Sequence, residues 1–392
     1  MDGNFQEMKH VPRPRLKTRL GDSLRHFRIT ALLGPRQCGK TTLAREFEVP
    51  RENYFDLEDP LDEARLQNPR DVLGALEGLV VIDEVQRLPE LFPVLRVLAD
   101  RVDNPTRFLI LGSASPALMT DASETLAGRV QFLRMGGFTC AEVGSEMRNR
   151  LWLRGGFPES FGSSSDRVSA QWRNAFVQTF LTRDLPSFGV GVAPAKLRRF
   201  WTMAAHYHGQ TWNSSAIASS MDMSHTTARS YLDILTEAYV MRQLQPWLPN
   251  MKKRLVKAPK VYLRDSGILH SLLQIDTVAA LQSNPRYGAS WEGFALEQLC
   301  AILELDPEEC YFWATHGGAE LDLFVLRGRR RYGFEFKRTT SPRVTPSMRS
   351  ALSDLKLNRL DVIHAGENTF PLAEKIRAVS WQRLLVDVQP LK

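Results

Sequence analysis

The sequence predicts an α/β fold in which a parallel sheet carries helices on both faces, and three observations favour it. A short apolar run, residues 29–33, leads directly into a glycine-rich turn and then into a segment of helical character. Two more apolar runs, residues 79–82 and 108–111, lack polar alternation, which is typical of central parallel strands buried on both faces. Polar residues follow each run, so functional groups are expected at the carboxyl edge of the sheet.

The glycine-rich turn has the spacing of a phosphate-binding loop. The segment GPRQCGKTTL begins at Gly34 and contains glycine, four residues, and then Gly-Lys-Thr. Such a loop turns successive backbone N–H groups inward at the start of a helix, where anionic oxygens are favoured. The order strand, loop, helix argues against a chance glycine-rich turn. We therefore predict the sheet of a P-loop nucleoside triphosphatase, with a loop made of Gly34, Pro35, Arg36, Gln37, Cys38, Gly39, Lys40, Thr41 and Thr42.

Four polar side chains have predicted roles in ATP hydrolysis. Lys40 is expected to reach the terminal phosphates, and the Thr41 hydroxyl is expected to ligate Mg²⁺. The apolar run at residues 79–82 ends in Asp83 and Glu84. Asp83 can hold the same Mg²⁺ through water, while Glu84 can polarise the water that attacks the phosphate. This acid pair favours hydrolysis over a kinase reaction, and an acid pair in a loop without a catalytic role is the alternative.

Two further residues are candidates for sensing the terminal phosphate. Ser113 follows the run at residues 108–111, and a hydroxyl at the tip of a strand next to Asp83 can contact that phosphate or its water. Arg129 is a candidate cation for the charge that develops in phosphoryl transfer, or else a surface arginine in an ion pair. Action of Arg129 on a neighbouring subunit would imply a homo-oligomer, and the sequence does not separate this from action within one chain.

Composition sets broad limits on the protein. A chain of 392 residues has room for two or three domains. The net charge of +7 and the pI near 9.3 are compatible with a polyanionic partner such as DNA without requiring one. Four cysteines without metal-ligand spacing indicate reduced thiols. No apolar run reaches the roughly 20 residues of a membrane span, and the first residues lack an apolar signal core, so we expect a cytoplasmic protein without a membrane partner.

Basic residues between positions 9 and 28 surround three leucines, Leu16, Leu20 and Leu24. The helical spacing of the leucines predicts an amphipathic helix packed against the nucleotide-binding domain. An arm that binds nucleic acid is the alternative.

Eight segments of the chain together resemble a known family. They are GPRQCGKTTL, VVIDEVQRLPELFPVLR, FLILGSAS, LAGRV, GGFPES, FLTRDLPSFG, KAPKVYLRDSGIL and WEGFALEQL. In these segments the chain resembles the AAA-type ATPases of bacteria and archaea that carry an uncharacterised C-terminal region, and the resemblance covers nearly the whole chain. It implies a Mg²⁺-dependent ATPase in which the phosphate loop binds ATP and Asp83 and Glu84 serve hydrolysis. Ala114 stands where similar sequences often have another hydroxyl, which leaves the choice between Ser113 and Ser115 open.

The middle of the chain is expected to be helical and to end in a winged helix. Helices at residues 214–221 and 225–238 flank a short turn, and a strand at 239–247 completes the motif. Its second helix can present polar groups to DNA phosphates or base edges, or the motif can only pack against a neighbouring domain. The basic segment that follows favours DNA slightly. The outward-facing residues are Thr226, Thr227, Arg229 and Ser230, and the basic residues are Lys252, Lys253, Arg254, Lys257 and Lys260.

Arg183 and Asp184 match a pair that recurs in similar sequences. The two residues form a structural ion pair, or Arg183 is a second phosphate-sensing arginine; the sequence leaves both interpretations open.

The last third predicts a restriction-endonuclease-like α/β domain. A helix carries Glu292 near its start, and three strands joined by glycine-containing turns follow. Because side chains alternate along a strand, Glu335 and Lys337 share one face, and the hairpin can bring Asp322 beside them. An acid followed by Glu-x-Lys resembles the pattern of that fold, which holds Mg²⁺ on hard oxygen ligands and orients a water for phosphodiester cleavage. An inherited scaffold with a charged surface network is the alternative.

Three domains are therefore expected, a P-loop ATPase domain at residues 1–145, a helical and winged-helix domain at 146–250, and a restriction-endonuclease-like domain at 251–392. We expect the nucleotide state to control a C-terminal region that binds or processes DNA. The alternative is a nucleotide-gated regulatory or scaffold protein with an inactive nuclease-like domain and no DNA affinity.

Overall fold

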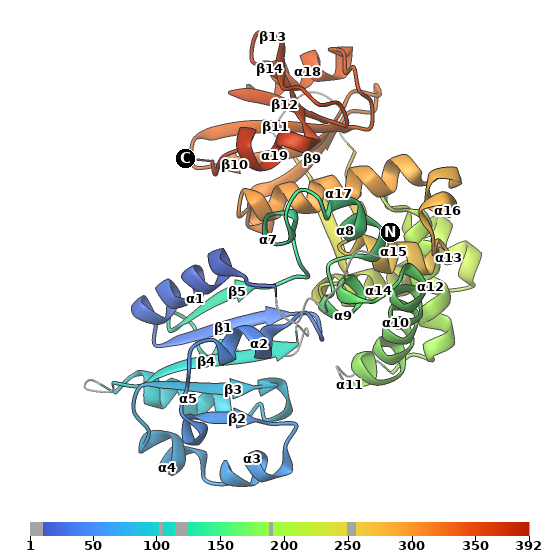
Figure 1. The fold of residues 1–392 in the computed structure, drawn as a ribbon. Helices are drawn as coiled ribbons and strands as arrows, with labels where there is room; N and C mark the ends of the chain where they lie inside the picture. The colour runs from blue at the N-terminus through green and yellow to red at the C-terminus, as the bar shows by residue number, and fades with distance from the viewer. Residues whose placement is uncertain (1–10, 102–104, 114–123, 188–190, 249–255, 392) are drawn as a thin grey trace.

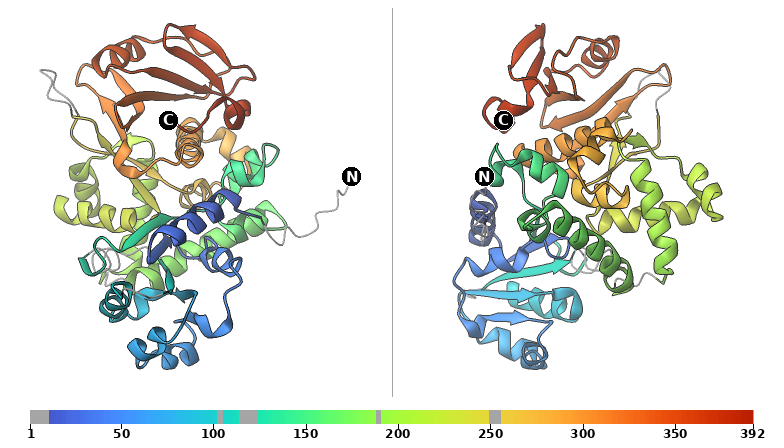
Figure 2. Two further views of the ribbon diagram at one scale, coloured as in Figure 1. Left: turned by 90° about the vertical axis from the view of Figure 1, so that its left-hand side faces the viewer. Right: turned by 45° about the vertical axis from the view of Figure 1, so that its right-hand side comes forward.

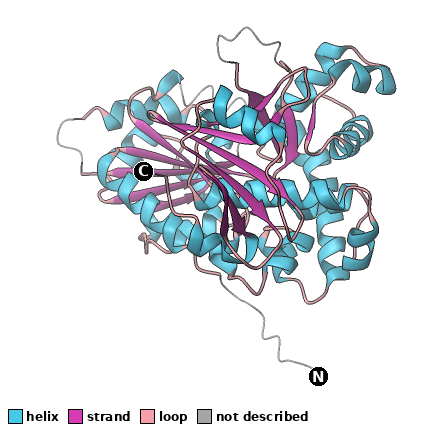
Figure 3. Cartoon of the chain, turned by 90° about the horizontal axis from the view of Figure 1, so that it is seen from above, coloured by secondary structure: helices cyan, strands magenta, loops and turns pink. Residues whose placement is uncertain are grey.

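The computed structural model describes residues 11–101, 105–113, 124–187, 191–248 and 256–391. A five-stranded sheet near the N-terminus and the last strands of a nine-stranded sheet lie at opposite ends of the molecule, with the helices of the middle segment between and beside them (Figures 1 and 2). Seen from above, helices surround the strands of both sheets (Figure 3). No helix within these ranges is both long and apolar enough to span a membrane.

The N-terminal sheet is parallel throughout and has the strand order β2-β3-β4-β1-β5. Along β1, alternate side chains enter different apolar cores, with Leu32 on one face and Ala31 and Leu33 on the other. This two-sided burial explains why the central strands are continuously apolar. The strands are β1 (Ile29–Gly34), β2 (Tyr54–Asp56), β3 (Leu79–Asp83), β4 (Arg107–Ser113) and β5 (Val130–Arg134).

Helices cover both faces of this sheet, so the predicted fold class is confirmed. Leu20 and Leu24 of α1 are buried in the core that contains Leu43 of α2, and α1 is therefore the amphipathic helix that the leucine spacing predicts. Leu73 of α4 and Leu95 of α5 belong to the core on the other face. The helices are α1 (Pro14–His26), α2 (Lys40–Arg45), α3 (Pro60–Arg65), α4 (Pro69–Gly74) and α5 (Leu91–Ala99).

The middle segment is helical, as expected. It includes a π-helical turn, Phe180–Asp184, between α10 and α11. The two helices of the expected helix-turn-helix are α13 and α14, each with a side-chain cap at its start, from Asn213 and Ser224. The helices are α7 (Cys140–Val143), α8 (Arg148–Arg154), α9 (Pro158–Gly162), α10 (Asp166–Thr179), α11 (Leu185–Ser187), α12 (Pro194–His206), α13 (Ser214–Met221) and α14 (His225–Glu237).

The second sheet is mixed and has the order β13-β14-β12-β11-β10-β9-β7-β8-β6. Helix α17 packs on one face, where Leu299 shares a core with Phe334, and α18 packs on the other face, where Met348 shares a core with Leu360. The strands are β6 (Gln210–Thr211), β7 (Met241–Pro246), β8 (Lys260–Leu263), β9 (Cys310–Ala314), β10 (Glu320–Arg327), β11 (Arg330–Lys337), β12 (Arg359–His364), β13 (Phe370–Ala373) and β14 (Ile376–Ser380). The helices are α15 (Ser266–Leu272), α16 (Val278–Ser283), α17 (Tyr287–Ile302), α18 (Pro346–Asp354) and α19 (Leu384–Asp387).

The strand that follows the helix-turn-helix does not end a separate module. β7 pairs with β8 in antiparallel fashion and with β9 in parallel fashion. The sheet therefore runs without interruption across the domain boundary expected at residue 250. The basic residues Lys252, Lys253 and Arg254 lie outside the described ranges.

Candidate functional site

Two glycines shape the phosphate loop between β1 and α2. A Cβ atom on Gly34 would lie 2.0 Å from the carbonyl oxygen of Met135, so the close approach of the two chain segments requires glycine. Gly39 has φ 98°, in the left-handed region, and leads into α2. The Sγ of Cys38 points to the same Met135 oxygen, at 3.6 Å, so this cysteine packs behind the loop. The loop is thus fixed from behind by the chain segment that follows β5.

Lys40 lies across the opening of this loop. Its Nζ donates hydrogen bonds to the carbonyl oxygens of Gly34, at 3.1 Å, and of Pro35, at 3.0 Å. The side chain is 5% exposed, so the ammonium group is held in a nearly dry position. A buried cation at this place is suited to an anionic ligand in the loop.

Thr41 of α2 and Asp83 of β3 lie together, although β4 separates β3 from β1, the strand that leads into α2. The Thr41 hydroxyl donates to Asp83 Oδ2 at 2.6 Å, and the Tyr54 hydroxyl donates to the same oxygen at 3.0 Å. The backbone N–H of Glu84 donates to Asp83 Oδ1 at 2.9 Å. The hydroxyl and carboxylate oxygens are ligand types that Mg²⁺ takes, so these two side chains fit the predicted metal site.

Glu84 lies next to the loop in an unusual backbone conformation. Its φ is 55°, a left-handed value that is sparsely populated for residues with a Cβ. Burial raises the pKa of the Glu84 carboxyl, and the positive charges of Lys40 and Arg36 act in the opposite direction. The Gln86 amide donates a hydrogen bond to its Oε2. A carboxylate with a raised pKa beside the loop is a better proton acceptor than an ordinary surface glutamate.

Ser113 ends β4 directly beside the loop, because its register partner in β1 is Gly34. The residue is 1% exposed. Its Oγ has no hydrogen-bond partner in the part of the chain that the structure describes. A hydroxyl at this position can bond an oxygen of a phosphate in the loop or of a water. Ser115, the alternative candidate, and Ala114 lie outside the described residues.

The structure does not bring Arg129 to the phosphate loop of its own chain. Arg129 precedes β5, whose first residue, Val130, pairs with Ile29 at the start of β1. It therefore lies at the opposite edge of the sheet from the loop. Its guanidinium binds the Asp100 carboxylate on the surface, at 2.6 and 2.9 Å. This position does not place Arg129 at the loop of its own chain, and the pair with Asp100 matches the alternative of a surface arginine in an ion pair. Action on a second subunit stays a prediction.

Arg36 connects the loop to the middle segment, a contact that the sequence analysis missed. Its Nη1 donates to Asp184 at 2.8 Å and its Nη2 donates to Glu58 at 2.6 Å. Arg183 also binds Glu58, at 3.0 Å. The same Arg36 Nη2 lies 3.8 Å from Glu84 Oε2. Arg183 and Asp184 are thus each bound to residues of the N-terminal part, and their recurrence in similar sequences was the signal that could have indicated this contact.

Arg13 is a second residue that the sequence analysis did not single out. It immediately precedes α1 and is 7% exposed. Its guanidinium donates to the backbone oxygens of Cys38, Gly136 and Gly137 at 3.4, 3.0 and 2.9 Å. It also binds Glu142 through two hydrogen bonds, at 2.7 and 3.2 Å. Arg13 therefore holds the rear of the loop and the segment after β5 together.

The structure also brings Asp322, Glu335 and Lys337 together. Lys337 Nζ lies 3.1 Å from Glu335 Oε2 and 3.7 Å from Asp322 Oδ2. The pairing of β10 with β9 is irregular at Asp322, and such irregularities re-aim side chains. Glu292 is close enough to this group to interact with its charges. Burial, and then the charge of Asp322, raises the pKa of Glu292 to about 7. Burial and Asp322 raise the pKa of Glu335 to about 8.

Lys260 also belongs to this cluster, whereas its sequence position suggested only that it was part of a basic segment. It is 5% exposed, lies 3.3 Å from Asp322 Oδ1 and forms an ion pair with Glu320. Two lysines thus neutralise the acids where a divalent cation would be held. Among the residues that the structure describes, no group of three or more His, Cys, Asp or Glu side chains is arranged to hold a metal ion. The cluster as arranged does not fit a metal centre.

The phosphate loop after β1 of a parallel sheet, with an Asp-Glu pair at the end of β3, two strands away, defines a P-loop ATPase domain. A family model described as an AAA domain matches residues 26–144. Models for two domains of unknown function match residues 145–279 and 287–384. The chain belongs to the family of the uncharacterized proteins Mb2031c of Mycobacterium bovis and Rv2008c of Mycobacterium tuberculosis. It is 52% identical to each over 368 residues, which is 94% of this chain and 83% of each relative.

Solved structures of lower similarity include a Walker-type ATPase, PABY2304, of Pyrococcus abyssi. It has 15% sequence identity and a TM-score of 0.49, and the match covers 70% of this chain and 99% of that one. The ORC2 protein of Aeropyrum pernix in its ADP form has 14% identity and a TM-score of 0.31, with 70% and 97% of the two chains covered.

Proposed function

We propose that this protein binds ATP with Mg²⁺ and hydrolyses it to ADP and phosphate. The observation that carries this proposal is the convergence of five side chains at one edge of the sheet, around a loop shaped by two glycines. Lys40 and Thr41 come from α2, Asp83 and Glu84 from the end of β3 and the residue after it, and Ser113 from the end of β4.

Each side chain has a part in the proposed reaction. Backbone N–H groups of the loop and Lys40 bind the phosphates, and Ser113 positions the terminal phosphate or its water. Glu84 accepts a proton from the water while the water oxygen forms a bond to the γ-phosphorus. The bond between the γ-phosphorus and the bridging oxygen breaks, and ADP leaves with that oxygen. Thr41 and Asp83 would hold Mg²⁺, which supplies charge neutralisation on the phosphate oxygens.

Replacement of Lys40 by alanine tests the nucleotide site. Hydrogen bonds to charged groups contribute about 1.5–3 kcal/mol, so Lys40→Ala is expected to weaken ATP binding by about 10- to 100-fold. Isothermal titration calorimetry with Mg²⁺-ATP measures this change. Lys196→Ala, at an exposed position of α12, is the matched control. Unchanged ATP binding and phosphate release in Lys40→Ala would remove the assignment.

We further propose that ATP hydrolysis changes how the N-terminal part is held against the middle segment. Arg36 supports this idea, because it belongs to the phosphate loop and at the same time binds Asp184 of the π-helical turn. It also approaches Glu84, whose charge state changes as hydrolysis proceeds. A change at the terminal phosphate can therefore reach the middle segment through one side chain.

The C-terminal part is proposed to bind DNA under the control of this ATPase, without cutting it. Exposed Thr226, Arg229 and Ser230 on the outer side of α14 support DNA contact, as does the net charge of +7. The ion pair of Lys260, a cation outside the acid and Glu-x-Lys pattern, with Asp322 argues against a nuclease. A regulatory or scaffold protein without DNA affinity is the second candidate.

An assay with duplex DNA and Mg²⁺ separates these functions. We expect an electrophoretic shift that weakens as the salt concentration rises, is reduced by Arg229→Gln, and is accompanied by no cleavage. Glu374→Gln, in the turn between β13 and β14, is a control for cleavage. Cleavage that is lost in Asp322→Asn and Lys337→Ala but kept in Glu374→Gln would establish a nuclease. The absence of any shift would assign the protein to the scaffold class.

A further inference from the structure

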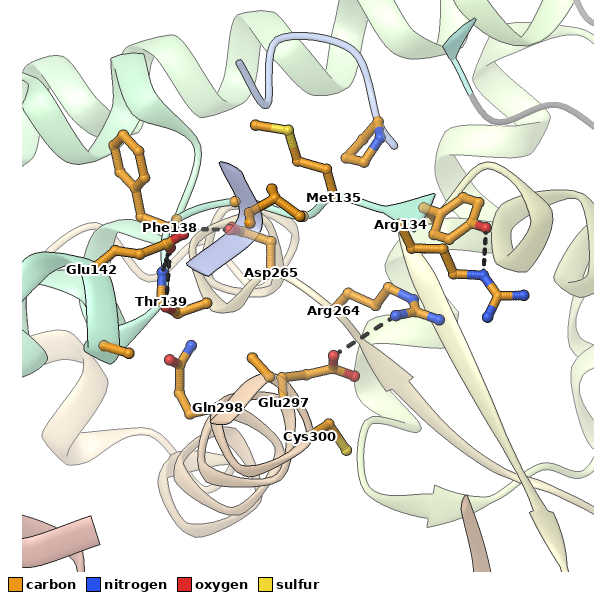
Figure 4. Close-up of a pocket in the computed structure, with 18 of the residues that line it drawn as sticks. Arg134, Met135, Phe138, Thr139, Glu142, Arg264, Asp265, Glu297, Gln298 and Cys300 are labelled. Carbon is orange, nitrogen blue, oxygen red and sulfur yellow. Dashed lines mark hydrogen bonds and ion pairs between the residues drawn. The ribbon is translucent and has the colours of Figure 1, made fainter. Parts of the chain in front are cut away.

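A cavity of about 330 Å³ lies behind the phosphate loop, where the three parts of the chain meet. The segment that follows β5, the start of α1 and the helix α17 form its walls (Figure 4). It differs from the proposed ATP site, because Lys40, Thr41 and Asp83 do not line it. Pro35 of the loop does line it, together with Met135 and Gly136, and the Met135 oxygen lies against Gly34.

Two arginines in this cavity, the buried Arg242 and the partly exposed Arg264, share one carboxylate. Arg242 binds Glu297 through two hydrogen bonds, at 2.5 and 2.9 Å. Arg264 Nη1 lies 3.9 Å from the same carboxylate, which Arg242 has already engaged. Burial, and then the charge of Arg242, lowers the pKa of Arg264 to about 10. This group of three carries one positive charge in excess beside a cavity that Asp265, Glu304 and Asp306 also line, and an anion bound by the guanidinium groups would stabilise it.

Arg134 adds a third guanidinium beside this pair. Its Nε donates to the Tyr239 hydroxyl at 2.9 Å, and the guanidinium carbon of Arg264 lies 5.4 Å from the centre of the same tyrosine ring. Figure 4 shows Arg134 and Arg264 as side chains of one pocket. The carboxylate nearest to Arg134 is Glu308, at 3.5 Å and with 73% of its side chain exposed. An exposed ion pair of this kind neutralises little.

Tyr239 is held in a strained conformation between the two arginines. Its φ is 58°, which is rare for a bulky residue. Strain of this kind persists where the surroundings enforce it, and it is concentrated at ligand sites and switches. The side chain of Tyr239 thus contacts both arginines, Arg134 through its hydroxyl and Arg264 through its ring.

The chemistry of the cavity selects a class of ligand. Guanidinium groups pair in bidentate fashion with phosphate and carboxylate. A phosphate monoester carries about −1.5 to −2 charges at pH 7, which matches two incompletely neutralised arginines better than a single carboxylate does. Met135, Phe138 and Phe294 supply an apolar wall. The volume is near the lower end of small-molecule sites, about 300–1,000 Å³, and too small for a polymer.

We propose that this cavity is a second ligand site, separate from the phosphate loop, and that it binds a small phosphorylated molecule through Arg134 and Arg264. Its wall is the segment whose backbone oxygens Arg13 holds against the rear of the loop, at Gly136 and Gly137. Occupancy of the cavity therefore changes ATP affinity, and ATP changes the affinity of the cavity by the same factor.

The test uses inorganic pyrophosphate as the probe and the full-length chain carrying Lys40→Ala, so that the phosphate loop is weakened. Calorimetry is expected to detect pyrophosphate binding that Arg264→Gln and Arg134→Gln each weaken by about 10-fold or more. Arg349→Gln, at an exposed position of α18, is expected to leave binding unchanged.

If Arg264→Gln destabilises the chain, the variant Arg134→Gln still tests the proposal. The Arg134 side chain is 35% exposed, and its replacement leaves the Arg242–Glu297 pair intact. Pyrophosphate binding that is absent, or equal in Arg134→Gln and in the parent protein, would overturn the proposal. Failure of ATP to bind the wild-type protein is a separate result, which concerns only the phosphate loop.

Discussion

Replacement of Glu84 by glutamine is expected to slow ATP hydrolysis by about 10²- to 10⁴-fold, the range for loss of a positioned general base. Glutamine has nearly the same shape and can still accept a hydrogen bond from Gln86, but it cannot take a proton from water. ATP binding is expected to stay within a few-fold of the wild-type value, because the groups proposed to hold the phosphates, Lys40 and the loop N–H groups, are unchanged. Single-turnover phosphate release measures the first effect, and calorimetry measures the second.

The same variant has a matched control in Glu77→Gln. Glu77 is exposed and precedes β3, at the opposite edge of the sheet from Glu84. Its replacement is expected to leave hydrolysis unchanged. Equal turnover in Glu84→Gln and wild type would exclude Glu84 as the base, and a parallel loss of ATP binding would indicate a structural role instead.

The pH dependence of hydrolysis provides a second readout for Glu84. A general base is active only when deprotonated, and burial raises the pKa of this carboxyl. The rate should therefore fall on the acidic side at a higher pH than for a solvent-exposed glutamate. This acidic limb is expected to be absent from the residual activity of Glu84→Gln.

The central strands of the first sheet could be predicted because their physical cause is local. All residues of β1, and all but the first of β3 and of β4, are buried on one face or the other, so the central run of each strand is mostly apolar. The edge strand β5 escaped notice because only one of its five residues, Leu133, is buried. That omission also misplaced Arg129. A residue that precedes a parallel strand lies at the edge opposite to the loop, and this follows from the sequence only once the strand is recognised.

The phosphate loop could be predicted because its residues are contiguous, whereas the groups that surround it are not. Arg36 and Asp184 are 148 positions apart, and Arg13 and Glu142 are 129 positions apart. A periodic pattern within one segment of the sequence cannot predict contacts between residues so far apart. Lys260 reaches Asp322 across 62 positions for the same reason. Lys260 begins β8, which pairs with β7, and β7 pairs with β9 across the expected domain boundary. This strand pairing brings Lys260 into the acidic cluster.

These long-range contacts share a physical feature that matters for function. Arg13, Arg36 and Arg242 each place a guanidinium where separate segments of the chain meet, and each is bound to carboxylates or backbone oxygens. Such bonds depend on orientation, unlike apolar contacts, so a small displacement of one segment weakens them. The phosphate loop is thus connected to the rest of the chain by contacts that respond to movement.

Replacement of Arg13 by alanine is expected to lower the free energy of unfolding of the N-terminal part by about 3 kcal/mol. Loss of one partner of a buried ion pair typically costs about 3–5 kcal/mol. The lower end applies here because Glu142 keeps two hydrogen bonds, from the backbone N–H and the hydroxyl of Thr139, at 2.7 and 3.0 Å. The backbone oxygens of Gly136 and Gly137 lose their shared donor, so the wall behind the phosphate loop loosens.

Hydrogen exchange of the backbone amides at residues 34–45, followed by mass spectrometry, measures this loosening directly. Faster exchange in Arg13→Ala is expected there, whereas β12 and β14 of the second sheet should keep their wild-type rates. Arg25→Ala in the same helix is the control, since its ion pair with Asp22 lies on the surface and contributes at most about 1 kcal/mol. Exchange in Arg13→Ala at the wild-type rate would show that Arg13 does not support the loop. Slower exchange in wild type than in both variants would instead assign the effect to α1 as a whole.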